Sequence, residues 1–278
     1  MQARTHDPIK GFHQRYGPWA VVAGASEGLG AAYAEALAER KLNLVLIARR
    51  LGLLEELSFR LAQKYSVEVC ILALDLASPD AVERISKETE NLKVGMLIYN
   101  AAYSAVGPFL NRSAEEHLLE VDTNVRTPLG LVNQFGARMI AAGHGGIVLM
   151  TSLSAFQGSA YISNYSATKA FNLVLAESLW EEWRRSEVDV LACIAGATRT
   201  PNYLASSPKR TGRFSDATLE PEVVVNEALA ALGRQPSVIP GRMNRLSSFV
   251  MRRLLSRRAA IRFMGSVLRG MYIHEQDK

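Results

Sequence analysis

Cysteine is scarce in this sequence, which has only Cys70 and Cys193 among its 278 residues. Each stands alone inside an apolar run, which argues against a disulfide framework and a cysteine-based metal cluster. We expect two buried, reduced thiols and no metal site. Residues 1–16 also lack the apolar core that a signal peptide or a membrane span requires. With 48% hydrophobic residues, enough for a full core, the composition favours a folded cytoplasmic protein.

Acidic residues are absent from residues 241–270, a stretch that holds eight arginines. The chain has a net charge of +5, so its remainder carries −3, the difference between +5 and +8. The basic character therefore belongs to the tail. Apolar residues recur there at helical spacings beside the arginines, namely Leu246, Val250, Leu254, Ile261, Met264 and Leu268.

This tail predicts a basic amphipathic helical extension over residues 241–278, following one domain over residues 1–240. Three interpretations of the extension remain open. It packs on the domain or a partner subunit, lies on an anionic membrane surface, or contacts nucleic acid, the least expected of the three. We predict no nucleic-acid partner and a peripheral membrane contact as one use of the extension.

The glycine-rich residues 24–30 join an apolar run of strand length, residues 19–23, to an alanine-rich helical segment. Glycines at such a turn allow a tight bend and close approach of the backbone to a pyrophosphate. The amino end of the helix then stabilises the phosphate charge. The spacing Gly-x-x-x-Gly-x-Gly differs from Gly-x-Gly-x-x-Gly, so the turn by itself does not distinguish a dinucleotide site from an ordinary strand–helix turn.

Apolar runs alternate with helical segments along the rest of the chain, which predicts an α/β fold with a single doubly wound parallel sheet of the Rossmann-like type. A long helical region over residues 113–142 contains Asn124 and Pro128, which predict a bend. Residues 202–217 are rich in serine, proline and charge, and we expect a loop that covers a cleft. The predicted strands cover residues 19–23, 43–48, 67–74, 94–99, 146–151, 188–194 and 237–239.

Tyr165 and Lys169 are four residues apart in a segment that is predicted to be helical, so both heads lie on one helix face. A nearby ammonium favours the phenolate, which allows the tyrosine to exchange a proton with a substrate oxygen near neutral pH. The pair alone is a weak signal, because Tyr-x-x-x-Lys occurs by chance in many helices.

Taken in order, the motifs resemble those of the short-chain dehydrogenases/reductases over residues 19–239. The glycine motif of that family is matched by residues 23–30, with alanine in place of threonine. Its Asn-Asn-Ala-Gly motif is matched by residues 99–102 with two departures, and its Pro-Gly-x-x-x-Thr motif by residues 195–200 without the proline. The catalytic positions of the family align with Asn124, Ser152, Tyr165 and Lys169.

The resemblance implies a nicotinamide-dependent oxidoreductase that interconverts a carbonyl and an alcohol. It implies that Tyr165 is the general acid or base and that Lys169 lowers its pKa and binds the nicotinamide ribose. It also implies that Ser152 polarises the substrate oxygen and that Asn124 holds a water leading to solvent. The positions implied for the cofactor are Gly24, Ser26, Glu27, Gly28, Leu29, Gly30, Arg49, Asp75, Leu76, Asn100, Ala101, Ala102, Tyr165, Lys169, Gly196, Thr198 and Thr200.

Arg49 follows the second strand, where an acid would bind a ribose 2′-hydroxyl and an arginine a 2′-phosphate. We therefore favour NADP(H) over NAD(H), although Glu27 opposes this choice because its charge could repel a 2′-phosphate. Residues 28–40 are similar to the branch with hydroxysteroid dehydrogenases and 3-ketoacyl reductases, which implies a lipophilic substrate. The aromatic candidates for its pocket are Tyr103, Phe109, Phe156, Tyr161 and Tyr203. A homo-oligomer, dimer or tetramer, is expected, and the alternative function is a nucleotide-binding sensor or scaffold without turnover.

Overall fold

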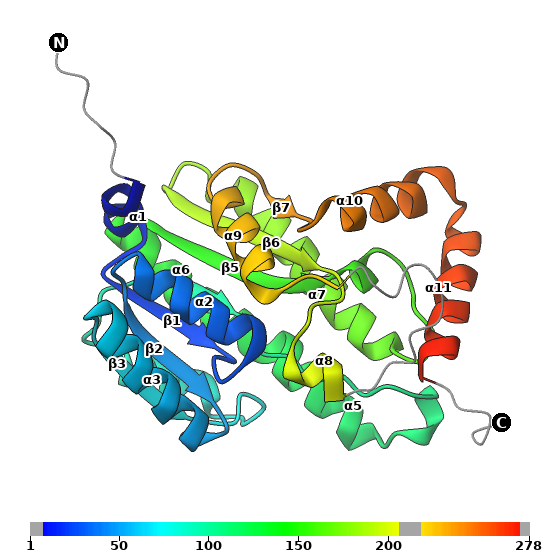
Figure 1. Ribbon diagram of the computed structural model, residues 1–278, viewed down its shortest axis with the longest axis horizontal. Coiled ribbons are helices and arrows are strands. Elements are labelled where there is room, and N and C mark those ends of the chain that lie inside the picture. Colours follow the sequence, from blue (N-terminus) through cyan, green and yellow to red (C-terminus); the bar gives the residue numbers. More distant parts are fainter. Residues whose placement is uncertain (1–7, 206–217, 273–278) are drawn as a thin grey trace, which may run out of the picture.

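The computed structural model describes residues 8–205 and 218–272, and its centre is a parallel sheet of seven strands (Figure 1). The strand order is β3-β2-β1-β4-β5-β6-β7, so the predicted doubly wound sheet is confirmed. The strands are β1 (Trp19–Ala23), β2 (Asn43–Ala48), β3 (Val69–Ala73), β4 (Val94–Tyr99), β5 (Gly145–Ser152), β6 (Val188–Ala195) and β7 (Ser237–Val238).

Helices cover both faces of the sheet, and each face has its own apolar core. Helices α2, α3 and α9 pack on one face, and α4, α6 and α7 on the other. The inner strands are buried almost throughout, which explains why their sequences are continuous apolar runs. The helices are α1 (Pro8–Tyr16), α2 (Gly28–Glu39), α3 (Leu51–Tyr65), α4 (Ala81–Glu88), α5 (Ala114–Val121), α6 (Thr127–Ala142), α7 (Ser163–Glu182), α8 (Pro201–Ala205), α9 (Pro221–Ala231), α10 (Arg242–Phe249) and α11 (Arg257–Tyr272), with 3-10 segments η1 (Phe109–Asn111) and η3 (Leu153–Phe156) and π-helical segments η2 (Asp122–Arg126) and η4 (Val250–Leu254).

The two cysteines differ in environment. Cys193 is buried in β6, as predicted, whereas Cys70 is exposed. The prediction for Cys70 was wrong because β3 is an edge strand of the sheet, so its residues are only partly covered.

The helical region of residues 113–142, for which a bend was predicted, is divided by a π-helical segment. Helix α5 begins with a capping box between Ser113 and Glu116, and α6 carries a proline in its first turn. Between them lies the π-helical segment η2, which includes Asn124. A π-helical turn widens the helix locally and redirects the side chain at that position.

The order in which strands are added reverses between β1 and β4. From β1 the chain adds β2 and β3 on one side, and from β4 it adds β5, β6 and β7 on the other. Ala23 pairs with Ile47 of β2 and with Tyr99 of β4, so these three strands end side by side. Ligands of doubly wound sheets bind at such a switch point.

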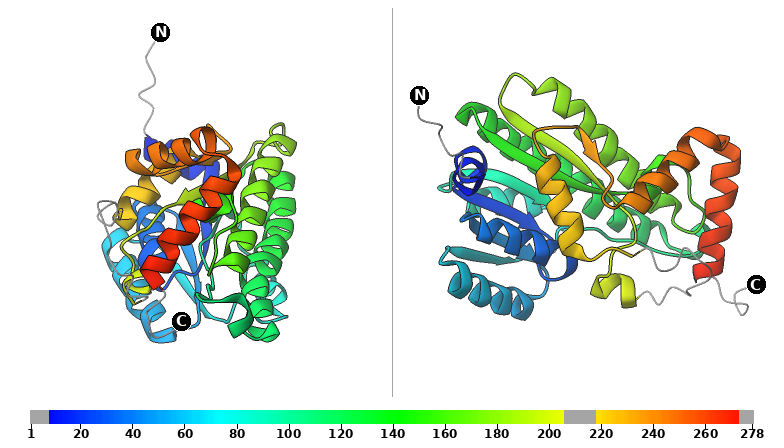
Figure 2. Two further views of the ribbon diagram at one scale, coloured as in Figure 1. Left: turned by 90° about the vertical axis from the view of Figure 1, so that its right-hand side faces the viewer. Right: turned by 45° about the horizontal axis from the view of Figure 1, so that its top comes forward.

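The C-terminal part of the chain lies at the outside of the molecule. Helix α11 stands at the end toward which the strands run, and α10 connects it to the edge of the sheet (Figure 1). Viewed from that end, α11 runs across the front of the protein (Figure 2). Of the loop predicted over residues 202–217, the first part forms helix α8, and residues 206–217 lie outside the described residues.

Candidate active site

The turn between β1 and α2 is too tight for side chains at its glycines. Gly24 has φ of +83° and Gly28 has φ of +56°, values that favour glycine. A Cβ atom added to Gly30 would lie 1.9 Å from the carbonyl oxygen of Gly24. Glu27, at the N-cap of α2, makes no capping hydrogen bond with its side chain. The first N–H groups of α2 are therefore open to an anion, as a pyrophosphate site requires.

Two distant segments close over this turn. The side-chain amide of Asn100 donates a hydrogen bond of 2.9 Å to the Gly24 carbonyl, and the Ala101 N–H donates one to Ala23. The methyl group of Thr200 lies against Gly28, 2.8 Å from the position of an added Cβ. The predicted cofactor residues of the glycine turn, Asn100, Ala101 and Thr200 are therefore brought together.

The residues that follow β2 and β3 include three further positions predicted to bind the cofactor. After β3, Asp75 accepts a hydrogen bond from the Ala77 N–H at 3.0 Å, and the Leu76 carbonyl accepts one from the Thr127 hydroxyl at 2.6 Å. Arg49 is exposed directly after β2. Its side chain is therefore available to a ligand at the edge of the sheet.

Arg50 is a residue that sequence reasoning missed. Its guanidinium forms an ion pair of 2.7 Å with Glu27 and donates a hydrogen bond of 3.1 Å to the Ser26 hydroxyl. The pairing partly neutralises the Glu27 carboxylate, whose charge was the argument against a 2′-phosphate. Only the double arginine after β2 could have indicated it in the sequence.

Tyr165 and Lys169 lie on the inner side of α7. The Lys169 ammonium is 5.6 Å from the centroid of the Tyr165 ring and donates a hydrogen bond of 2.9 Å to the Met150 carbonyl of β5. Lys169 is 2% exposed, and this burial lowers its pKa from 10.5 to about 8. A buried ammonium beside a half-buried phenol favours loss of the phenolic proton.

Ser152 ends β5 and pairs in register with Ala195 at the end of β6. Its hydroxyl accepts a hydrogen bond from the Ser154 N–H at 3.3 Å, which is long, so the oxygen can also bind a ligand. Because α7 packs on β5, Ser152 and Tyr165 belong to adjoining elements at the same edge of the sheet.

Asn124 is fully buried in η2. Its side-chain oxygen accepts from the Tyr103 N–H at 2.9 Å, and its amide donates to the Tyr103 carbonyl at 2.8 Å and to the Thr168 hydroxyl at 3.1 Å. The Asn172 amide donates to the Asn124 carbonyl at 2.9 Å. Asn124 thus fixes the chain after β4 against α7.

Glu120 is a second residue that sequence reasoning missed. It is 1% exposed on α5, and His117 precedes it by one turn on the same face. The two Glu120 oxygens and His117 Nδ1 make no hydrogen bond of normal geometry within the described residues. Burial raises the pKa of Glu120, whereas the Asn164 amide and the Ala105 N–H favour its charged form. The charge of Glu120 also raises the pKa of Lys169, opposing the effect of burial.

Replacing Glu120 with glutamine is expected to lower the pKa of Lys169 below about 8, because the substitution removes the negative charge that favours the ammonium. Lysine titration followed by NMR of ¹³C-labelled, cofactor-free protein measures this pKa directly. Glu115→Gln, an exposed carboxylate on the same helix, serves as the control and should leave it unchanged. An unchanged or raised pKa in Glu120→Gln would show that the two groups are not coupled.

The segment after β6 carries the remaining predicted positions. The Thr198 hydroxyl donates to the Gly196 carbonyl at 3.1 Å, and Thr198 pairs with Leu219 in an isolated bridge. Gly196 is packed against the side chain of Asn244 on α10, so that an added Cβ would lie 2.6 Å from its amide nitrogen. Helix α10 of the C-terminal extension therefore supports this segment directly.

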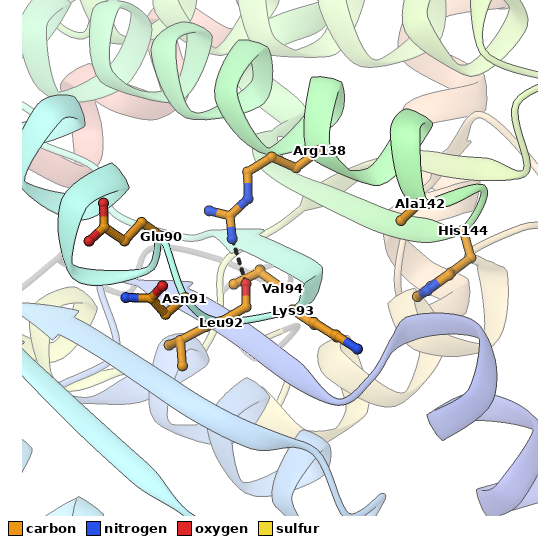
Figure 3. A pocket seen from close by; sticks show the side chains of 8 residues that line it. All are labelled: Glu90, Asn91, Leu92, Lys93, Val94, Arg138, Ala142 and His144. Carbon is orange, nitrogen blue, oxygen red and sulfur yellow. Dashed lines mark hydrogen bonds between the residues drawn. The ribbon is translucent and has the colours of Figure 1, made fainter.

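A separate surface hollow of about 460 Å³ lies at the opposite edge of the sheet, where β4 and β5 begin (Figure 3). Arg138 crosses it to donate hydrogen bonds to the carbonyls of Thr89 and Leu92. These bonds fix the segment between α4 and β4. The hollow contains none of the predicted site residues, and the arginine has a structural role.

The family model for short chain dehydrogenases matches residues 18–210. The chain belongs to the short-chain dehydrogenase family. A 7beta-hydroxysteroid dehydrogenase of Mediterraneibacter gnavus is 32% identical over 92% of this chain and 98% of its own length. A solved structure from work on 7beta-hydroxysteroid dehydrogenase stereoselectivity superimposes with a TM-score of 0.85 at 29% identity, covering 91% of this chain and 99% of its own.

A second solved structure of the family, a short-chain dehydrogenase of Sphingobium yanoikuyae in complex with NADPH, has a TM-score of 0.72 at 30% identity. It covers 80% of this chain and 87% of its own. Membership in a family of oxidoreductases confirms the resemblance drawn from the motifs. The role of each site residue in this chain stays a prediction.

Proposed function

We propose that this short-chain dehydrogenase is an NADP(H)-dependent oxidoreductase that interconverts a ketone and a secondary alcohol on a hydroxysteroid. The observation that carries the proposal is the buried Lys169 ammonium 5.6 Å from the Tyr165 ring. This pair lies at the same edge of the sheet as Ser152 and the β1–α2 turn. A proton donor thereby stands near a site suited to a dinucleotide.

The residues at the switch point fit NADP(H). The β1–α2 turn admits no side chain at Gly30, and the amino end of α2 is uncapped. Arg49 and Arg50 follow β2, and Glu27 is already paired with Arg50, so a 2′-phosphate meets the Arg49 cation and a neutralised carboxylate rather than an isolated one. A short-chain dehydrogenase with NADPH bound is among the similar structures, which supports the same choice. NADP(H), when bound, would supply or accept the hydride.

In the reductive direction Tyr165 gives its proton to the substrate carbonyl oxygen, and in the oxidative direction it removes the proton of the hydroxyl. Lys169 stabilises the resulting phenolate by its charge. Ser152 donates a hydrogen bond to the substrate oxygen as negative charge develops there. A water on the Asn124 carbonyl returns a proton toward Lys169. The chain thus moves one proton at the carbonyl oxygen for each hydride transferred.

A hydroxysteroid is favoured as the substrate because a relative and a solved structure named for 7beta-hydroxysteroid dehydrogenase match this chain over 98% and 99% of their own lengths. Of the aromatic pocket candidates, Phe109 stacks on His117 with ring centroids 4.1 Å apart, and Phe156 and Tyr161 contact arginines of the C-terminal part. Phe156 and Tyr161 therefore contact the C-terminal extension, whereas Phe109 contacts α5. Cytoplasmic location and a homo-oligomeric state remain predictions.

A panel of steroid ketones and 3-oxoacyl thioesters, assayed by nicotinamide absorbance with NADPH and with NADH, tests the proposal. We expect reduction of steroid ketones and a clear preference for NADPH. Preference for NADH would contradict the role of the arginines, and activity on the thioesters alone would contradict the steroid assignment. NADPH binding without turnover on any ketone would favour the alternative, a nucleotide-binding sensor or scaffold.

A further inference from the structure

The C-terminal extension, described here over residues 241–272, presents large apolar side chains to the outside. On α10, Met243, Leu246 and Phe249 are 55%, 56% and 55% exposed and recur every three residues. Leu254 in η4 is 68% exposed and Phe263 on α11 is 50% exposed. Both helices lie on the outer surface in the two views of Figure 2. The extension packs on the protein through other residues, since Ala260 and Leu268 are buried.

Helix α10 turns its polar side inward, which is the reverse of an ordinary surface helix. Asn244 and Ser248 are its buried residues. The Asn244 amide donates to the Pro240 carbonyl at 2.9 Å and fills the space beside Gly196. This packing fixes the orientation of the helix, so the apolar side remains outward.

Arginines surround the apolar residues, and within the described residues most of them have no acidic partner. Of the eight, only Arg245 forms an ion pair within the described residues, with Glu227 at 2.6 Å. Arg252 and Arg269 lie over the rings of Phe156 and Tyr161, respectively. The remaining five are exposed and have no carboxylate within reach in the described part of the chain, namely Arg242, Arg253, Arg257, Arg258 and Arg262. In the described part of the chain, the result is a surface that combines apolar side chains with positive charge that no carboxylate pairs.

We propose that this surface, formed by α10, η4 and α11, docks on an anionic lipid bilayer. Helices with apolar residues flanked by arginines lie in the interface, with the apolar residues in the acyl boundary and the guanidinium groups among the headgroups. A second copy of the chain fits less well, because a symmetric contact would place the same unpaired arginines against one another. No helix within residues 8–205 and 218–272 is long and apolar enough to span a bilayer, so the docking is peripheral.

The docking surface is connected to the segment that precedes Tyr165. Arg252 lies over the Phe156 ring, 4.1 Å from its centroid, and Arg269 donates a hydrogen bond of 2.9 Å to the Tyr161 hydroxyl. Phe156 ends η3, and residues 157–162 join η3 to α7, between Ser152 and Tyr165. Docking would therefore bring the catalytic edge close to the bilayer, where a lipophilic substrate dissolves. The docking itself does not rest on the proposed reaction.

Co-sedimentation of the full chain with vesicles of phosphatidylcholine, with and without phosphatidylglycerol, tests the proposal in the absence of substrate. We expect binding only to the anionic vesicles and its loss at high salt. Replacing Arg253 and Arg257 with glutamine should weaken binding by about fivefold for each arginine. Leu246→Glu should abolish it, whereas Phe59→Glu, which alters an apolar residue 70% exposed on α3, should not.

Thermal unfolding of each variant, compared with the unaltered chain, tests whether the substitution leaves the fold intact. We expect unchanged unfolding temperatures, because the altered side chains are exposed. Absence of binding to anionic vesicles would overturn the proposal. A dimer in light scattering that Leu246→Glu dissociates, together with no vesicle binding, would assign the surface to a second copy instead. Equal binding to neutral vesicles would overturn the role given to the arginines.

Discussion

Replacing Tyr165 with phenylalanine is expected to lower kcat for ketone reduction by about 10³-fold, within the range of about 10²- to 10⁴-fold for loss of a general acid. This corresponds to about 4 kcal/mol of lost transition-state stabilisation. The substitution removes only the hydroxyl, and Tyr165 is half-buried with the Lys169 ammonium 5.6 Å from its ring. The ring therefore stays in place, and steady-state kinetics measure the loss of the proton donor.

NADPH affinity separates this chemical role from a structural one. In Tyr165→Phe the β1–α2 turn and the arginines after β2 are unaltered, so fluorescence titration should give an affinity within a few fold of the original. Tyr65→Phe, which alters a tyrosine at the last residue of α3 whose hydroxyl donates to Glu35, is the matched control and should keep its turnover. Turnover retained in Tyr165→Phe would remove the phenol from the mechanism.

Replacing Gly30 with alanine is expected to damage the dinucleotide site. The added Cβ would lie 1.9 Å from the Gly24 oxygen and 2.9 Å from the Asn100 amide nitrogen. The nearest atom belongs to the backbone, so the turn itself must shift. Overpacking of this kind costs about 1–3 kcal/mol, which corresponds to a loss of about 5- to 150-fold in NADPH affinity if the shift moves the N–H groups of α2. Fluorescence titration and thermal unfolding measure the two effects.

Gly52→Ala provides a matched control within α3. A Cβ at Gly52 meets no atom within 4 Å, and alanine is favoured over glycine in a helix by about 1 kcal/mol. This variant should therefore be slightly more stable and bind NADPH normally. The proposed cofactor site would be wrong if Gly30→Ala bound NADPH as tightly as Gly52→Ala does.

Much of the fold and of the site could be predicted because both depend on local patterns. Buried parallel strands require continuous apolar runs, and the chain shows them at regular intervals between helical segments. Residues that end such strands must meet at one edge of the sheet, whatever the details of packing. For this reason Ser152, Asn100 and the glycine turn could be placed near Tyr165 from the sequence alone.

Contacts between side chains from distant elements could not be predicted. The Glu27–Arg50 pair depends on how the β1–α2 turn meets the end of β2, and the effect of Glu120 on Lys169 depends on how α5 packs on α7. Helix α10 contradicts the usual expectation, since its periodicity favours an inward apolar face. The space beside Gly196 instead accepts Asn244. The sequence of α10 alone does not indicate which of its side chains fits that space.

The contact between Gly28 and Thr200 also constrains the order in which the protein acquires its ligand during synthesis. The turn at Gly28 leaves the ribosome early, whereas Thr200 follows β6, which must first pair with β5. A nascent chain that ends before residue 200 therefore lacks one wall of the nucleotide site. Because a ligand stabilises only the species that binds it, the dinucleotide cannot assist the early βαβ units. It can protect only the nearly complete chain.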